Sequence, residues 1–517
     1  MKKLKLVCVA IAMAGAAPTF AGGLLTNTNQ HVAFNRMMSR EASIGIDGVY
    51  YNPAGVVFMG EGHHLAINWQ LAYQTRTINN DYKLFTNNVN NPITPRDFKG
   101  KAFAPVIPSF QYAYNKGKWS FQANFSLTGG GGKCTFDDGL GSFEKIVSET
   151  AIAACKLAGA VDQVAEAYHV PAIFSSNQCF GTEGKYSYNS YMHGRQYYYG
   201  LSLGAAYKFS DNFSAFAGVR GVYASTNYYG YVENIKVGAM PLYKVLDPTK
   251  ETAANIELSC DQSGVGFTPI IGVDFKTGKW NFAAKYEFKT RIRLKNKSVN
   301  QAPSIGNLPD NLRNAYIAGG VPKAAADAII GNPVIQGAMG QLKTQFDAKL
   351  EKAIGEYEDG KKIAGDIPGY LALGIGYSPV DAVRVNVGFH WFDDKNATSY
   401  NNRNKELKRG TLEYNAGVEV DVNKKITLST GWQNTNYGLS DEYMDDKSFV
   451  VSSNSAAIGG VYHINKKMDL NVAYFHTFYQ HKKTSETVQL AADKSIVYNS
   501  DYTRNNNVFA VGLDINF

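Results

Sequence analysis

Hydrophobic and polar residues alternate along the last stretch of the chain, residues 507–517. Every second position in it is apolar: Phe509, Val511, Leu513, Ile515 and Phe517. The positions between them are small or polar, apart from Val508. Successive side chains of a strand point to opposite faces, so this pattern predicts a strand with one apolar face. About ten residues is the length of a tilted strand that crosses a bilayer, although an edge strand of a soluble sheet shows the same alternation.

The same alternation recurs in segments that short polar turns join in pairs. Six such turns lie at 115–118, 210–212, 276–279, 378–381, 423–425 and 465–467. Together with a first segment at 63–78 and the last at 507–517, they predict fourteen strands. An even number of strands, with short turns alternating with long connections, is typical of bacterial outer-membrane barrels. We therefore expect an all-β fold, a 14-stranded antiparallel transmembrane β-barrel with both termini in the periplasm.

Charged residues occupy the polar face of several predicted strands. In the segment 280–294, aromatic and aliphatic residues alternate with charged ones: Lys285, Glu287, Lys289, Arg291 and Arg293. Arg220 and Arg384 take the same face of their own strands. In a soluble sandwich this face would be solvated surface, whereas in a closed barrel it is the lumen.

Two long connections show the periodicity of amphipathic helices. The first, between the third and fourth strands, has Phe143, Val147 and Leu157 on its apolar face. The second, between the seventh and eighth strands, has Met339, Leu342 and Phe346 on its apolar face. Such faces need burial, either in a ligand pocket or as a cap over the barrel mouth. We favour the pocket because a lipid site is concave and apolar, and these six residues are our candidate ligand-binding residues.

A ligand with a carboxylate would need a basic partner, because a charge-assisted contact is the usual way to hold such a group. Arg220, Arg293 and Arg384 are the lumenal candidates. The alternative for each is an ion pair with Asp or Glu across the barrel.

The beginning of the chain predicts export. Residues 1–21 combine three lysines, an apolar run and small residues, which is the pattern of a signal peptide. Residues 22–62 precede any alternation and are too short to form a core alone, so we expect them to pack as a hatch inside a barrel of residues 63–517.

Composition and charge narrow the possible functions. The 33 tyrosines, 28 phenylalanines and 50 glycines suit aromatic strands with many turns. The net charge of +8 is not accompanied by a basic aromatic patch, so we expect no nucleic-acid partner. His63 and His64 lack the spacing of zinc ligands, and we expect no metal, no cofactor and no enzymatic activity. A hydrolase assembled from distant strands is the enzymatic alternative.

Four cysteines follow the predicted signal peptide: Cys134, Cys155, Cys179 and Cys260. An even number in an oxidising compartment predicts two disulfides, and four cysteines allow three pairings. Because the first three fall in one predicted extracellular loop and Cys260 near the end of the next, we expect at least one bond between these loops.

Several segments resemble the FadL family of outer-membrane transporters for long-chain fatty acids and other hydrophobic compounds. The most specific is Asn52-Pro53-Ala54, which resembles the hatch motif, and strand-like segments at 108–114, 285–290 and 366–377 are similar. The resemblance implies a hatch-plugged barrel, an extracellular apolar pocket and sideways release through a kink in the third strand. That strand is expected to end at Thr128 and to run into Gly129, Gly130, Gly131 and Gly132. These glycines are our candidate gate; a plain linker, or a kink at 120–124, are the alternatives.

The function that follows is passive uptake of long-chain fatty acids or other hydrophobic small molecules. A general porin and a structural or adhesive barrel are the alternatives. The expected partners are the hydrophobic ligand, outer-membrane lipid and lipopolysaccharide, and the barrel-assembly machinery, because the terminal Phe517 resembles the C-terminal signal of outer-membrane barrels.

Overall fold

The structure, a computed structural model, describes residues 28–491 and 494–517, so the predicted signal peptide lies outside the described part. Long antiparallel strands form one sheet in this part. Their bounds are β1 (Gly62–Tyr82), β2 (Arg96–Lys116), β3 (Trp119–Phe136), β4 (Tyr186–Lys208), β5 (Phe213–Val237), β7 (Ile256–Thr277), β8 (Trp280–Glu287), β9 (Arg293–Gln301), β10 (Lys362–Ala364), β11 (Tyr370–Val380), β12 (Val383–Phe392), β13 (Thr411–Asn423), β14 (Ile426–Asn436), β15 (Ser453–Asn465), β16 (Met468–Tyr479), β17 (Lys482–Ala491) and β18 (Lys494–Asn516).

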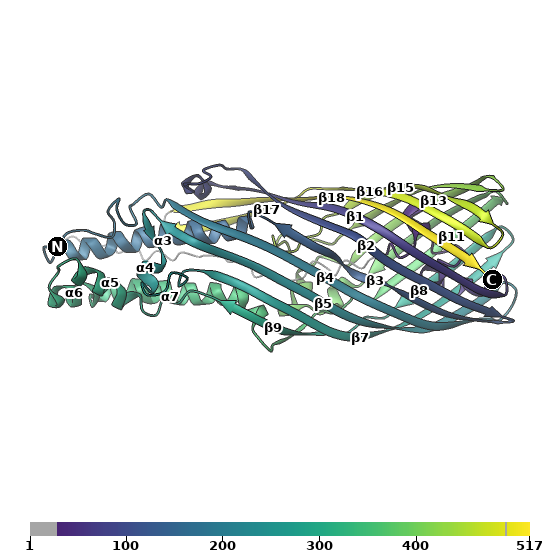
Figure 1. The fold of residues 1–517 in the computed structure, drawn as a ribbon, viewed down its shortest axis with the longest axis horizontal. Helices are drawn as coiled ribbons and strands as arrows, with labels where there is room; N and C mark the ends of the chain where they lie inside the picture. Colours follow the sequence, from purple (N-terminus) through teal and green to yellow (C-terminus); the bar gives the residue numbers. More distant parts are fainter. Residues whose placement is uncertain (1–27, 492–493) are drawn as a thin grey trace.

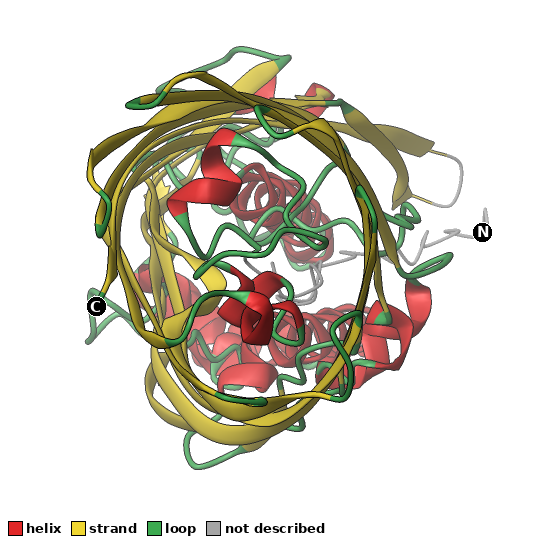
Figure 2. Ribbon diagram, turned by 90° about the vertical axis from the view of Figure 1, so that its right-hand side faces the viewer, coloured by secondary structure: helices red, strands yellow, loops and turns green. Residues whose placement is uncertain are grey.

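The sheet closes into a barrel because β1 pairs with both β2 and β18 (Figures 1 and 2). Three wall strands are interrupted: β9 continues β8, β10 leads into β11, and β17 continues β16 along the same neighbouring strands. Over the described residues the wall therefore has 14 strands, which confirms the predicted barrel. Figure 1 shows the short turns and the C-terminus at one end of the barrel, the turn end, and the helical connections at the other, the loop end.

The alternation of the last strand places its side chains as predicted. Phe509 is 52% exposed on the outer wall, whereas Val508 is 2% exposed toward the lumen. On the neighbouring β1, Trp69 is exposed on the outside, and Asn68 and Gln70 are buried inside. An apolar exterior around a polar interior is the surface distribution of a membrane-spanning barrel.

Helices gather at the loop end. These helices are α3 (Gly141–Glu166), α4 (Tyr243–Leu246), α5 (Leu308–Ala318), α6 (Lys323–Ile330) and α7 (Pro333–Ile354). The helices α3 and α7 are the two that the periodicity predicts. Shorter elements in the connections are η2 (Lys83–Asn87), β6 (Met240–Pro241), η3 (Gly355–Tyr357), η4 (Asp394–Asn396) and η5 (Tyr400–Glu406). In the described part of the chain, no helix is both long enough and apolar enough to cross a membrane.

The N-terminal segment, residues 28–61, packs against the inner face of the wall. It contains α1 (Val32–Arg36), α2 (Gly48–Tyr51) and η1 (Gly55–Phe58). Viewed along the barrel axis, helices and loops lie within the ring of strands (Figure 2). Phe34, Tyr50 and Tyr51 of this segment form an apolar cluster with lumen-facing Phe475 and Val508. Its short apolar run is therefore buried by the barrel, which supplies the core that the segment lacks.

One predicted strand changes face midway. In β8, Lys285 and Glu287 are each 3% exposed and face the lumen, as the alternation predicts. Beyond the break between β8 and β9, Ile292 and Leu294 are the buried residues and Arg293 is the exposed one. A shift of one residue at a strand break moves every later side chain to the opposite face. The expectation that Arg291 and Arg293 point into the lumen is therefore wrong.

Candidate functional site

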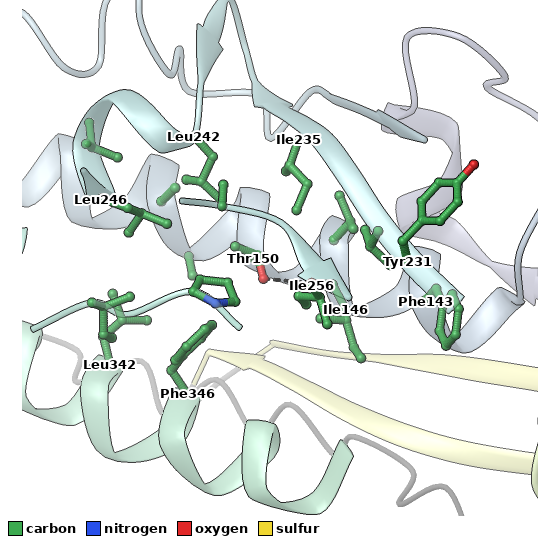
Figure 3. A pocket seen from close by; sticks show the side chains of 18 of the residues that line it. Phe143, Ile146, Thr150, Tyr231, Ile235, Leu242, Leu246, Ile256, Leu342 and Phe346 are labelled. Atoms are coloured by element: carbon green, nitrogen blue, oxygen red, sulfur yellow. Dashed lines mark hydrogen bonds between the residues drawn. The ribbon is translucent and has the colours of Figure 1, made fainter. Parts of the chain in front are cut away.

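An apolar pocket of about 160 Å³ lies at the loop end, and we call it the loop pocket (Figure 3). One wall is the apolar face of α3, with Phe143, Ile146 and Thr150 toward the cavity. Leu342 and Phe346 of α7 approach from below in the view, and Leu242 and Leu246 from the opposite side. Most of the remaining lining residues come from the loop-end parts of β5 and β7, from α5 and from the connections between them.

Five of the six predicted ligand-binding residues line this pocket: Phe143, Val147, Leu157, Leu342 and Phe346. Met339 is 5% exposed and belongs to the surrounding apolar cluster, but it does not reach the cavity. The structure thus brings together two helices that lie almost 200 residues apart in the chain. Their role in binding stays a prediction.

Lys447 is the one charged residue among the described residues that line the loop pocket. It lies in the connection between β14 and β15, and burial lowers the pKa of its amine to about 8, although Asp445 and Glu356 act in the opposite direction. Among the described residues, no carboxylate lies within ion-pair distance of this amine. Sequence reasoning missed Lys447 because a single lysine after two aspartates in a loop carries no periodic signal.

The three predicted carboxylate-binding arginines lie away from the loop pocket and are already paired. Arg220 binds Glu287 with both terminal nitrogens, at 2.6 and 2.9 Å. Arg293 contacts Asp366 at 2.8 Å, and Arg384 contacts Asp421 at 2.6 Å. Each of the three arginines therefore forms an ion pair within the protein, which was the alternative to carboxylate binding.

The predicted hatch motif is fastened to three wall strands. The side-chain amide of Asn52 donates to Asp274 of β7 at 2.6 Å. The carbonyl of Pro53 accepts from Gln122 of β3, and that of Ala54 accepts from Ser214 of β5, both at 2.7 Å. Lumenal side chains thus satisfy backbone groups of an irregular segment, which hydrocarbon would leave unpaired.

A gap in the hydrogen-bond ladder separates the middle parts of β2 and β3, and we call it the wall gap. The two strands pair at 100–102 with 134–136 and again from Phe110 onward, but residues 103–109 of β2 have no partner on β3. Pro105 and Pro108 fall in this stretch and lack the N–H that a ladder requires. The two prolines are the signal in the sequence from which this gap could have been predicted.

The predicted glycine gate lies on the other edge of this gap. The expectation that the third strand ends at Thr128 is wrong, because β3 runs through Gly129, Gly130, Gly131 and Gly132 to Phe136. Its pairing with β4 shifts register twice here, and Gly130 and Gly132 have φ values of +95° and +73°. Only glycine adopts this backbone region at little cost, so these residues let the strand continue with bulges instead of ending it.

A second cavity of about 200 Å³, the lumen cavity, lies between the wall gap and the N-terminal segment. Its lining includes residues of both gap edges, of the N-terminal segment and of β16 and β18: Ala104, Val106, Gly130, Gly132, Gln30, Phe34, Phe475, Arg504 and Val508. Gln30 reaches both edges, since its side-chain amide donates to the carbonyl of Leu127 and its own carbonyl accepts from Ser109. The N-terminal segment therefore bridges the gap from inside.

The four cysteines are free thiols in the structure, so the expected disulfides are not formed. Cys134 and Cys260 lie within β3 and β7, not in loops, because both strands extend further than the alternation suggested. They are buried in separate apolar clusters, while Cys155 and Cys179 share the cluster around the loop pocket. Within the described residues, no group of His, Cys, Asp or Glu is placed to hold a metal ion.

No protein-family profile matches this chain, and no curated protein sequence is similar to it. Solved structures are similar in fold. A FadL homologue from Pseudomonas aeruginosa superposes with a TM-score of 0.60 at 13% identity, covering 96% of this chain and 100% of that one. The toluene transporter TodX from Pseudomonas putida gives 0.51 at 12% identity, over 96% and 100% of the two chains. The chain therefore has the fold of the FadL homologue, a 14-stranded antiparallel barrel.

Proposed function

We propose that this protein takes up a hydrophobic small molecule across the bacterial outer membrane, without an energy source of its own. The loop end faces the outside and the turn end faces the periplasm. The observation that carries the proposal is an apolar pocket at the loop end of a barrel whose lumen holds the N-terminal segment. A pocket lined almost wholly by apolar side chains favours a lipid-like ligand over a hydrophilic solute.

The exit that we propose is sideways, through the wall gap. The hydrogen bonds that would close the wall between β2 and β3 are missing there. The lumen cavity reaches the gap from inside the barrel. The apolar side chain of Phe103, opposite the exposed Tyr73 of β1, is exposed on the outer side of β2 at this level. A hydrophobic molecule leaving here enters the bilayer without crossing the polar N-terminal segment.

The ligand class that we favour is a long-chain fatty acid, because Lys447 gives the loop pocket one positive charge. A protonated amine in an apolar cavity forms a charge-assisted hydrogen bond with a carboxylate. The TodX likeness favours the second candidate, a neutral aromatic hydrocarbon, since that protein is a toluene transporter. A neutral ligand would leave the amine unpaired in the cavity, which disfavours it.

Two measurements on the purified full-length protein test the proposal. In planar bilayers, wild type should show no steady ion conductance, whereas deletion of residues 22–40 should open a conducting pore. Equilibrium binding of hexadecanoate in an uncharged detergent should saturate at the loop pocket, and Leu342→Asp should abolish it because a carboxylate would be buried in the apolar lining.

The alternatives give different results. A general porin would conduct without the deletion. A structural or adhesive barrel would bind no hexadecanoate, and either outcome would refute the proposed uptake.

A further inference from the structure

Two arginines face each other on neighbouring wall strands. Arg76 of β1 lies directly opposite Arg504 of β18 in the antiparallel register. Both guanidinium groups donate to the same atom, Oε1 of Gln74: Nε of Arg76 at 3.2 Å and a terminal nitrogen of Arg504 at 2.6 Å. Like charges directly opposite across two strands are destabilising, and one neutral amide oxygen does not neutralise them.

These arginines differ from the other lumenal cations. Arg36, Arg40 and Arg220 each contact a carboxylate in the barrel. Among the described residues, no carboxylate lies within ion-pair distance of Arg76 or Arg504. Carboxylates therefore neutralise Arg36, Arg40 and Arg220. Within the described residues, Arg76 and Arg504 have no carboxylate that could do the same.

Arg504 has donors left over. Its residue is 6% exposed, and in the described part of the chain its Nε has no hydrogen-bond partner. Its other contacts are the carbonyl of Phe449, at 3.5 Å, and the ring of Tyr479, 5.1 Å from the guanidinium carbon. A buried charged donor without an acceptor is costly, so an external acceptor would stabilise it.

Arg504 of this pair lies close to the wall gap. Arg504 lines the lumen cavity, which also contacts Gly130 at the gap. The apolar cluster between the two cavities contains Met192, which lines the loop pocket, and Ala102, which lines the lumen cavity. Phe449, whose carbonyl accepts a hydrogen bond from Arg504, belongs to the same cluster. A molecule that moves from the loop pocket through the lumen cavity to the wall gap would therefore pass Arg504.

We propose that Arg76 and Arg504 form an anion-binding site that holds the carboxylate of an amphiphile on its way to the wall gap. The proposal rests on the proposed uptake function and adds a second site to it. A carboxylate accepts paired hydrogen bonds from a guanidinium and offsets the repulsion between the two arginines. Its alkyl chain lies against Phe475 and Val508, the apolar lining of the lumen cavity. A neutral hydrocarbon gains nothing from the site.

Uptake of two probes with the same chain length tests the site. Radiolabelled hexadecanoate and hexadecanol are supplied to cells carrying wild type, Arg76→Gln, Arg504→Gln, the double variant, or Lys99→Gln as an exposed control. The double variant should lower hexadecanoate uptake on the order of tenfold, because the charge-assisted hydrogen bonds to the carboxylate are lost. Uptake of hexadecanol, and both uptake rates of the control, should stay at the wild-type level.

Binding separates this site from the loop pocket. Hexadecanoate should still bind the purified double variant, and Arg504→Lys should keep part of the uptake. A photoreactive hexadecanoate with a diazirine near its carboxyl group should label β18 next to Arg504 in wild type, which gives a readout that needs no substitution. Equal losses for acid and alcohol, unchanged acid uptake, or no labelling of β18 would overturn the site. If wild type takes up neither probe, the proposed uptake fails, and the site fails with it.

Discussion

The side-chain amide of Gln30 donates to the carbonyl of Leu127 at 2.9 Å, which joins the N-terminal segment to the open edge of β3. The carbonyl of Gln30 accepts from Ser109 on the opposite edge at 2.6 Å. One residue of the N-terminal segment therefore replaces part of the ladder that β2 and β3 do not form. In the proposed function, a shift of this segment and an opening of the wall are coupled through Gln30.

Gln30→Ala should increase uptake of hexadecanoate. Loss of the bond to Leu127 removes about 1 kcal/mol that holds the gap closed, so an uptake rate limited by opening rises by about fivefold. Initial rates in whole cells with matched surface expression measure this. Gln122→Ala is the control, since it removes one bond to Pro53 away from the gap. Equal rates in wild type and Gln30→Ala would contradict the coupling.

The double substitution Pro105→Thr and Pro108→Thr should slow uptake and leave binding intact. It restores two N–H donors in the part of β2 that lacks partners on β3, so the ladder can close further. Hexadecanoate binding to purified protein and uptake in cells are measured side by side. Gly130→Val is a poorer test of the gap, because a Cβ there would lie 2.3 Å from the carbonyl oxygen of Gln196 and disturb β3 itself. Unchanged uptake in the proline variant would exclude the wall gap as the exit.

Binding of hexadecanoate at the loop pocket should weaken between pH 7 and pH 9. The Lys447 amine, with its pKa lowered to about 8, is protonated below this range and neutral above it, while the carboxylate stays ionised throughout. The charged groups around it are Asp445, Asp446, Glu356 and Arg403. Affinity should fall by up to about tenfold per pH unit above the pKa.

Two comparisons isolate this effect. Lys447→Gln should make hexadecanoate binding independent of pH, whereas Lys343→Gln, at an exposed lysine of α7, should keep the wild-type profile. Hexadecanol should not lose affinity between pH 7 and pH 9 in any variant, because it has no carboxylate for the amine to bind. A pH profile that persists in Lys447→Gln would show that another group titrates.

Val511→Arg should destabilise the folded barrel by about 2–4 kcal/mol, because it places a charge on the lipid face near the middle of the wall. Val497→Arg is the matched change on β18, at a position beyond the end of β1 that pairs only with β17, and should cost about 0–1 kcal/mol. Folding titrations into lipid vesicles compare them. Gly512 is unsuitable as a control, since a Cβ there would lie 2.4 Å from the side-chain oxygen of Asn68. Equal costs would place Val511 outside the hydrocarbon.

The sequence by itself determined the barrel, its 14 strands, the short turns and the two long apolar helices. These features follow from periodicity within one segment, since alternate side chains of a strand point to opposite faces and every third or fourth residue of a helix shares one face. The local pattern also placed Lys285, Glu287 and Arg220 in the lumen, where they are buried.

Only the tertiary structure decided which of these elements meet. The face that Arg293 takes depends on a single-residue shift at a strand break, which the local alternation does not contain. Arg76 lies opposite Arg504 because of the register between β1 and β18, whose residues here are more than 400 positions apart in the chain. Lys447 reaches the loop pocket only because the connection between β14 and β15 folds toward it. Pairing and burial are properties of neighbours in space, and for this chain those neighbours are distant in sequence.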